Sequence, residues 1–499
     1  MIIPPKKEKM RKRHKQPFNS IGDKSAVYRL VSLLETKASL NGPTLRFSVS
    51  FLSTVLRKFF HLGSLVKRSF IMKGNQKKVF IDARFVCDRG KIDARRIAIY
   101  FTSNGYQIVT QPKNADVIVF NCCGFSTSIA QAGLEQLQRY KRYGAEILLV
   151  GGLPETDKDA CRQVFNGKAL SHKELEKLDQ LYPHHNVPIA EIEDQHTPWM
   201  TRSSASPWSL LREISLIQKA SFSIADFIFR HRIGGDYLIL GNPLDLPTSE
   251  VFRLRISWGC TFNCSYCAII KATGKLRSKP LQKCVQAFTT GLQEGFHTFH
   301  IIGVDPAGYG KDCGLTYSQL LYQLCAQDGN YRFRLEAVHP AWFVTYQHEL
   351  ETVCRQGKIA AISVPFQSGS TRILHLMNRY ADLEKLLEAL HGIKEAWPSL
   401  VLATNVIVGF PTETDAEFLD TLRFIDQANF DLGVLFPVSL KPGTRASTIE
   451  PRISPEMIQQ RMTTAKKYLR EKNYGVVSVH GQGLWFGRPL HHRQGSSVS

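Results

Sequence analysis

The chain lacks any long uncharged apolar run. No stretch of its 499 residues reaches the roughly 18 apolar residues that a membrane-spanning helix needs. The apolar patches of residues 45–71 are interrupted by Arg57, Lys58, Lys67 and Arg68. This pattern predicts no membrane span and favours a short basic amphipathic helix in that segment.

Cysteine is too sparse for a disulfide scaffold. The chain carries 11 cysteines at irregular spacing, whereas folds held together by disulfides are short and dense in cysteine. We therefore expect reduced thiols and metal sites, and a reducing compartment such as the cytoplasm.

Acidic residues are scarce at the N-terminus. Residues 1–78 hold 18 Lys and Arg but three Asp and Glu, so they carry +15 of the net charge of +21. We expect this basic extension to be a disordered tail or a start assigned too early, with Met72 as the alternative start. The run at 6–15 also resembles an arm for nucleic acid or a membrane surface. Residues 45–71 are also poor in acidic residues and rich in Ser, Arg and Lys, so an organellar transit peptide stays open as an alternative.

Strands alternate with helices from residue 79 onward, which predicts a small parallel α/β domain over residues 79–156. Ligands of such sheets bind beyond the carboxyl ends of the strands. Residues 157–250 are less regular, and we expect an interdomain connection there. The expected elements are strands at 79–81, 115–121 and 146–152 and helices at 93–101 and 128–142.

The strand–helix alternation repeats about six times within residues 251–446. This repeat predicts an α/β fold of the partial (βα)6, TIM-like type, with its active site at the carboxyl ends of the strands. Residues 447–499 are expected to form a C-terminal helix and a short tail.

A loop with three closely spaced cysteines follows the first of these strands, residues 251–257. Cys260, Cys264 and Cys267 have CxxxCxxC spacing, so their thiolates can bind one soft metal centre. A tetrahedral zinc site takes four protein ligands, or three and a water, and the loop contains no fourth Cys or His. A [4Fe–4S] cluster on three cysteines keeps one iron open, which the amine and carboxylate of S-adenosylmethionine can chelate. The alternatives are a zinc loop or three unrelated thiols.

Further motifs follow the cysteine loop in a fixed order, at 274–280, 302–305, 338–340, 365–370, 376–379, 407–414 and 441–444. With them, residues 79–446 resemble the methylthiotransferase family of radical SAM enzymes. That family contains the tRNA 2-methylthioadenosine synthases and the enzyme that methylthiolates a ribosomal-protein aspartate. The resemblance implies a radical SAM barrel, a [4Fe–4S] cluster, S-adenosylmethionine and an electron donor such as flavodoxin or ferredoxin.

The motifs contain the residues that we expect to contact the cofactor. Glycine and proline at strand ends let the backbone approach a ligand closely. Amide and hydroxyl side chains can bind a ribose or a carboxylate. Arg379 can pair with a carboxylate of the cofactor or cap a helix. Each single motif is equally compatible with a structural turn, and no catalytic residue is assigned. The cofactor-binding candidates are Gly303, Gln367, Ser368, Arg379, Gly409 and Pro411.

The N-terminal domain departs from the family, which holds a second cluster there on three cysteines. Cys87 and Cys123 stand at the first two positions, but Leu153 stands at the third and cannot bind iron. Two thiolates rarely hold a cubane, which usually takes four, and Cys122 is the candidate for a third ligand. The family's C-terminal RNA-binding barrel is also largely missing, because residues 475–499 stand in its place.

The leading interpretation is a radical SAM enzyme that uses a 5′-deoxyadenosyl radical to activate a C–H bond. The reaction would be methylthiolation of a tRNA adenosine or a protein side chain. The alternative is a diverged radical SAM enzyme that acts on a small molecule or peptide without sulfur insertion, which Leu153 favours. A third class, a non-catalytic binding protein of the same fold, is disfavoured by the intact CxxxCxxC loop.

Overall fold

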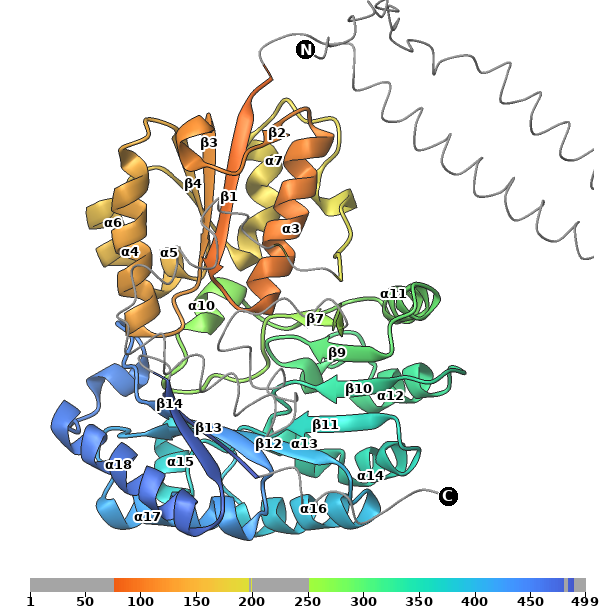
Figure 1. Ribbon diagram of the computed structural model, residues 1–499, viewed down its shortest axis with the longest axis vertical. Coiled ribbons are helices and arrows are strands. Elements are labelled where there is room, and N and C mark those ends of the chain that lie inside the picture. The colour runs from red at the N-terminus through yellow and green to blue at the C-terminus, as the bar shows by residue number, and fades with distance from the viewer. Residues whose placement is uncertain (1–75, 197–198, 200–250, 480–482, 489–499) are drawn as a thin grey trace, which may run out of the picture. The chain divides into compact units, whose positions relative to one another are not determined.

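Five parallel strands form the N-terminal sheet, in the order β2-β1-β3-β4-β5 (Figure 1). The computed structural model describes residues 76–196, 199, 251–479 and 483–488. The strands are β1 (Lys78–Phe85), β2 (Gln107–Ile108), β3 (Val117–Cys122), β4 (Glu146–Gly151) and β5 (Lys168–Ser171). The α-helices are α3 (Asp88–Ser103), α4 (Thr127–Lys141), α5 (Leu153–Thr156), α6 (Lys158–Val164) and α7 (Leu178–Leu181).

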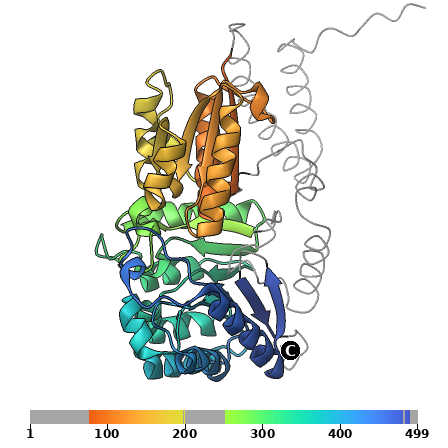
Figure 2. The ribbon, with the colours of Figure 1, turned by 90° about the vertical axis from the view of Figure 1, so that its left-hand side faces the viewer.

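Helices cover both faces of this sheet (Figures 1 and 2). Ile97 of α3 and Leu178 of α7 are buried in the core on one face. Leu137 of α4 and Cys161 of α6 are buried in the core on the other. The strands are therefore apolar on both sides, as parallel strands between two helix layers usually are. The predicted parallel α/β fold of this part is confirmed.

The N-terminal sheet extends beyond residue 156, where we expected a connection to begin. Strand β5 pairs in parallel with β4, and the 3-10 helices η2 (His172–Lys177) and η3 (Ile189–Glu191) follow it. Leu170, Leu175 and Ile189 from this stretch are buried in the core. A four-residue strand among polar neighbours carries too little periodicity to be recognised. Residues 200–250 and the basic extension lie outside the described residues.

The second sheet has eight strands in the order β14-β15-β13-β12-β11-β10-β9-β6, and the six from β6 to β13 run parallel. The parallel strands are β6 (Val251–Arg255), β9 (Thr298–Ile302), β10 (Arg332–Leu335), β11 (Ile359–Ser363), β12 (Val401–Val408) and β13 (Leu432–Pro437). The helices are α10 (Ile269–Thr273), α11 (Leu281–Gln293), α12 (Tyr317–Cys325), α13 (Pro340–Thr345), α14 (Gln347–Arg355), α15 (Thr371–Met377), α16 (Leu383–Ala396), α17 (Asp415–Gln427) and α18 (Pro455–Glu471). The predicted partial (βα)6 barrel is confirmed.

The two faces of the barrel strands differ in polarity. Leu254, Ile301 and Leu335 point to the helix side and belong to the main hydrophobic core. The alternate residues Arg253 and His300 are register partners on the inner face, and both are buried. Because side chains alternate along a strand, one short run supplies both the core and a polar interior.

A C-terminal hairpin extends the barrel sheet, where only a short apolar tail was expected. Strands β14 (Gly475–Val479) and β15 (Gly483–Gly487) are antiparallel to each other, and β15 pairs with β13. Leu484, Trp485 and Phe486 are buried. The hairpin therefore covers the edge of the last parallel strand, which would otherwise expose unpaired backbone groups. Within the described residues, no helix is long and apolar enough to span a bilayer.

Candidate functional site

The cysteine loop leaves the barrel at the carboxyl end of β6. The short strand β7 (Ser257–Trp258) pairs with β8 (Arg277–Ser278), which closes the loop at its base. Gly259 has a positive φ of 68°, and a Cβ there would lie 1.9 Å from the Lys275 carbonyl oxygen. Glycine is therefore required at the entrance to the loop. The Cys260 amide donates to the Gly274 carbonyl at 3.2 Å.

The far side of the loop is held by segments from elsewhere in the barrel. The Ser265 amide donates to the Met377 carbonyl at 2.8 Å, and the Ser265 carbonyl accepts from the Ala446 amide at 2.9 Å. The Asn263 carbonyl accepts from the Asn378 side chain at 2.9 Å. These bonds fix the backbone on both sides of Cys264.

The three loop thiols are each partly exposed. Burial and the nearby Asp305 carboxylate raise the pKa of Cys260 to about 12, so binding of a metal centre there would release a proton. Arg379 donates through Nη1 to the Cys264 sulfur at 3.7 Å and through Nη2 to the Pro365 carbonyl. Arg379 therefore lies against the loop, where it offsets thiolate charge.

No group of three or more His, Cys, Asp or Glu side chains in the described residues is arranged around a single metal-ion position. Each cysteine of a cubane cluster binds a different iron. The three loop thiols therefore need not converge on one position to hold a cluster.

Gly303 and Gln367 lie at the carboxyl ends of β9 and β11. A Cβ on Gly303 would approach the Ser257 hydroxyl to 2.7 Å. Gln367 has a positive φ of 73°, and its backbone bridges to β12 through the Asn405 carbonyl at 3.2 Å and the Ile407 amide at 3.0 Å. A non-glycine residue held at positive φ is strained, and such strain is common at ligand sites.

Ser368, Gly409 and Pro411 have clear packing roles. Ser368 is fully buried, and its hydroxyl accepts from the Ser370 amide at 3.2 Å. A Cβ on Gly409 would lie 2.4 Å from Ile458 of α18, while its amide donates to Glu413 at 2.8 Å. Pro411, also buried, forms the turn that follows. These residues shape the strand ends, and the structure brings them to the same end of the barrel as the loop.

Several buried polar atoms inside the barrel have no partner among the described residues, although buried polar groups are nearly always hydrogen-bonded. They include Ser363 Oγ, Asn405 Oδ1, Glu336 Oε2 and His300 Nε2. Ser363 and Asn405 alternate with core residues of β11 and β12. They were not predicted from the sequence, although a lone polar residue in an apolar strand is a visible signal. Together with three thiols, these atoms form a donor set that fits a cluster and a polar cofactor.

Cys87 and Cys123 lie at the carboxyl ends of β1 and β3, and the Cys123 amide donates to the Phe85 carbonyl at 2.9 Å. Arg89, two residues after Cys87, donates through Nη1 to the Gly303 carbonyl at 2.7 Å and to Glu336 at 3.1 Å. Both thiols lie near enough to Arg89 for their charges to act on its guanidinium, and Arg89 in turn reaches the strand ends that carry Gly303 and Glu336.

Cys122 points in the opposite direction from Cys123. It is fully buried in the core beside Leu137 and Leu153, and a Cβ on Gly133 of α4 would lie 2.4 Å from its sulfur. Burial raises the pKa of Cys122 well above that of a free thiol. Since Leu153 is also buried and offers no ligand atom, the residues here do not fit a second cubane cluster.

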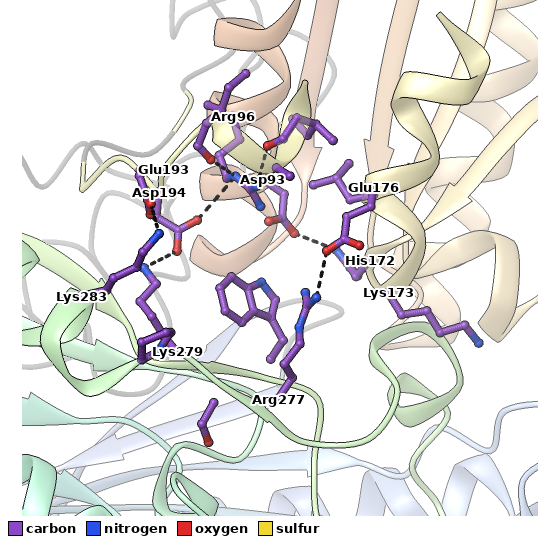
Figure 3. Close-up of a pocket in the computed structure, with 17 residues that line it drawn as sticks. Asp93, Arg96, His172, Lys173, Glu176, Glu193, Asp194, Arg277, Lys279 and Lys283 are labelled. Carbon is purple, nitrogen blue, oxygen red and sulfur yellow. Dashed lines mark hydrogen bonds and ion pairs between the residues drawn. The ribbon is translucent and has the colours of Figure 1, made fainter. Parts of the chain in front are cut away.

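A buried ion-pair network joins the N-terminal sheet to the barrel. Arg255 of β6 donates to Asp93 of α3 at 2.6 Å and through Nε to Asp194 at 3.0 Å. Lys279 also reaches Asp194 at 3.0 Å. Figure 3 shows the adjoining pocket of about 240 Å³, where Asp93, Asp194 and Lys279 lie among further charged residues. These ion pairs bring opposite charges together across the pocket and connect the two parts.

Two family models match the chain. The radical SAM superfamily matches residues 254–425, which contain the cysteine loop and most of the barrel. The uncharacterized protein family UPF0004 matches residues 78–170, which contain the N-terminal sheet.

Curated relatives match both parts together. A tRNA-2-methylthio-N(6)-dimethylallyladenosine synthase of Aquifex aeolicus is 26% identical over 392 residues, which cover 77% of this chain and 82% of that protein. The protein of the same name from Fusobacterium nucleatum is also 26% identical, over 75% of this chain and 80% of that protein.

Among solved structures, the radical S-adenosylmethionine methyltransferase TsrM from Kitasatospora setae has a similar fold. With tryptophan and a SAM analogue bound, its TM-score is 0.51 at 11% identity, over 83% of this chain and 86% of that one. With cobalamin and a [4Fe–4S] cluster bound, the TM-score is 0.50 at 12% identity, over 74% and 77%. With its three-thiol loop, its ordered motifs and its relatives over both parts, the chain is a diverged member of the methylthiotransferase family of radical SAM enzymes.

Proposed function

We propose that this enzyme activates a C–H bond of an adenosine in tRNA, in a reaction of the methylthiotransferase type. The observation that carries the proposal is the meeting of two sets of strand ends. The loop thiols and the unpartnered polar atoms lie toward the strand ends of the barrel. Arg89, from the strand ends of the N-terminal sheet, donates hydrogen bonds to Gly303 and Glu336 of the barrel. Relatives that span both parts are named as synthases of a modified tRNA adenosine.

Membership of the radical SAM superfamily implies a [4Fe–4S] cluster and S-adenosylmethionine. Cys260, Cys264 and Cys267 would hold the cluster. When bound, it supplies the electron that cleaves S-adenosylmethionine to methionine and a 5′-deoxyadenosyl radical. A low-potential donor such as flavodoxin or ferredoxin would provide that electron to the enzyme.

The protein residues orient the reactants and keep water away from them. The hydroxyl of Ser363 and the amide oxygen of Asn405 can bind the polar parts of the nucleoside or the amino acid. The Arg379 guanidinium balances charge beside Cys264. The N-terminal strand ends cover the barrel interior through Arg89, which limits the access of solvent to the reacting atoms.

A second candidate is radical chemistry on the same substrate class without sulfur insertion. The observation that favours it is the core position of Cys122 together with Leu153 at the third ligand position. Without a second cluster, the enzyme lacks the sulfur donor that the family is thought to use.

We expect about four irons per chain after anaerobic reconstitution, the content of one [4Fe–4S] cluster. Replacing Cys122 or Cys123 by alanine should leave this count unchanged, because neither is expected to hold iron. Iron and sulfide analysis checks this. A count of about eight that falls to about four in Cys122→Ala would show that a second cluster exists and that Cys122 holds it.

The substrate class can be tested with unfractionated tRNA from a strain that lacks this enzyme. Anaerobic incubation with S-adenosylmethionine and a reductant should give 5′-deoxyadenosine and a modified adenosine, detected by mass spectrometry of nucleoside digests. A gain equal to a methylthio group identifies methylthiolation, and any other mass change at adenosine identifies the second candidate. Unchanged tRNA with a modified protein would contradict the RNA substrate.

A further inference from the structure

Phe125 is unusually exposed for a phenyl ring in the loop between a strand and a helix of the N-terminal sheet. Its exposed fraction is 54%, the highest for a large apolar side chain in the described residues. It follows Cys123 and Gly124 in the loop at the carboxyl end of β3. A single exposed apolar residue is common on protein surfaces, so the case for a ligand depends on where this ring lies and on what surrounds it.

The loop that carries Phe125 is held tightly at both ends. The Ser126 hydroxyl caps α4 by accepting from the Ile129 amide at 3.3 Å. The amide and hydroxyl of Thr127 each lie 2.9 Å from the Ser439 hydroxyl, beyond β13. The ring therefore stands on a fixed backbone and can act as a preorganised surface.

The Phe125 ring meets one aromatic neighbour, Phe436 of β13, with centroids 6.1 Å apart and planes at 76°. In this edge-to-face arrangement, Phe436 supports the ring without lying parallel to it, so planar stacking remains possible for a ligand. Because Phe436 lies near the carboxyl end of β13, the ring stands at the mouth of the barrel.

A cation lies close enough to the Cys123 thiol, two residues before Phe125, for its charge to act on that thiol. The Arg89 guanidinium makes its hydrogen bonds within the described residues through Nη1, which leaves Nη2 for another acceptor. An aromatic surface with a nearby guanidinium is the combination that proteins use to bind unpaired RNA bases and their phosphates. A protein side chain as ligand would not need the planar ring.

We propose that Phe125 is the stacking surface for the unpaired purine that the enzyme modifies, and that Arg89 contacts a phosphate or a base edge of the same RNA. This proposal rests on the RNA substrate proposed above. It adds a specificity-determining residue that stands between the two sheets, next to the thiol of Cys123.

The experiment uses the anaerobically reconstituted full chain and an RNA stem–loop with 2-aminopurine in place of the loop adenosine. Stacking on Phe125 should quench the 2-aminopurine fluorescence when the RNA binds. Phe125→Ala should abolish the quenching and weaken RNA binding by about 10-fold to 100-fold, since base–aromatic stacking has that size on alanine substitution. Phe125→Tyr keeps the ring and should restore both.

Tyr143→Ala is the matched control, because Tyr143 is an aromatic residue exposed at 40% that precedes β4 at the amino end of the same sheet. It should bind and quench like the wild type. Quenching at the wild-type level in Phe125→Ala would overturn the stacking role of Phe125, but would not contradict the proposal that the substrate is RNA. If the wild-type enzyme binds no RNA and modifies a protein instead, both proposals fail together. Iron content and thermal unfolding, compared with wild type, show that each variant is folded.

Discussion

Replacing Cys260, Cys264 and Cys267 together by alanine should abolish the production of 5′-deoxyadenosine. The three thiols come from one loop whose backbone is fixed on both sides, by the Gly274 carbonyl and by the Met377 carbonyl. Their removal leaves no soft ligand in that loop, so the cluster should not assemble. We expect 5′-deoxyadenosine to fall to the background of the reaction without enzyme, and iron content to fall with it.

Cys313→Ala is the control for this variant, because Cys313 is an exposed thiol outside the loop. It should retain iron and the wild-type rate. Undiminished 5′-deoxyadenosine from the triple variant would contradict the assignment of the loop as the cluster site. The N-terminal thiols would then be the candidates for binding the cluster.

Arg255→Met should be the most destabilising single change in the connection between the two sheets. The Arg255 side chain is 2% exposed and pairs with Asp93 and Asp194, whose side chains are 4% and 8% exposed. Methionine fills similar space but leaves two buried carboxylates without their guanidinium. Removing one partner of a buried ion pair costs about 3–5 kcal/mol. Chemical denaturation of the full chain, followed by far-UV circular dichroism, measures the loss.

Arg277→Met is a matched control. Both guanidinium groups lie 4.9 Å from the Trp258 ring, but Arg277 and its partner Glu176 are 57% and 67% exposed. An exposed pair contributes roughly 0–1 kcal/mol, so Arg277→Met should change the free energy of unfolding little. Equal losses in the two variants would show that contact with Trp258, and not burial of the ion pair, carries the stability.

The pH dependence of Arg255→Met follows from the same pair. Burial alone would raise the pKa of Asp93, but the Arg255 guanidinium and His172 hold it at about 2. A carboxyl with a depressed folded pKa stabilises the fold above its unfolded pKa of about 3.9, and this stability is lost as the pH falls through the folded value. In the wild type, stability should therefore fall between about pH 4 and pH 2. In Arg255→Met this contribution should be smaller or reversed in sign.

The barrel could be predicted because each strand–helix unit repeats a strong pattern. Its strands are almost wholly apolar on the helix side, as Leu254 and Ile301 are, and strands with this pattern recur between amphipathic helices. Strand β5 and the β14–β15 hairpin were not predicted. They are short, and their register depends on pairing with distant strands, which local sequence does not encode.

The candidate site was predictable where chemistry constrains the spacing of residues, as at the CxxxCxxC loop. It was less predictable where the same residue type can either contact a cofactor or serve the packing of the protein. Gly409 avoids a collision with Ile458 of α18, and the Ser368 hydroxyl bonds the Ser370 amide. The Cys122 side chain of β3 packs against Gly133 of α4. These contacts are tertiary, so sequence spacing alone could not reveal them.

The Arg255 network also makes two events in this enzyme thermodynamically dependent on each other. Arg255 is the last residue of β6, two residues before the strand that leads into the cysteine loop, and its partner Asp93 belongs to the N-terminal part. Any ligand that stabilises the loop therefore also favours docking of the N-terminal sheet, and docking favours the ligand by the same factor, because coupling between two equilibria is reciprocal. Loss of the cluster to oxygen would then loosen the cover of the barrel as well as stop the reaction.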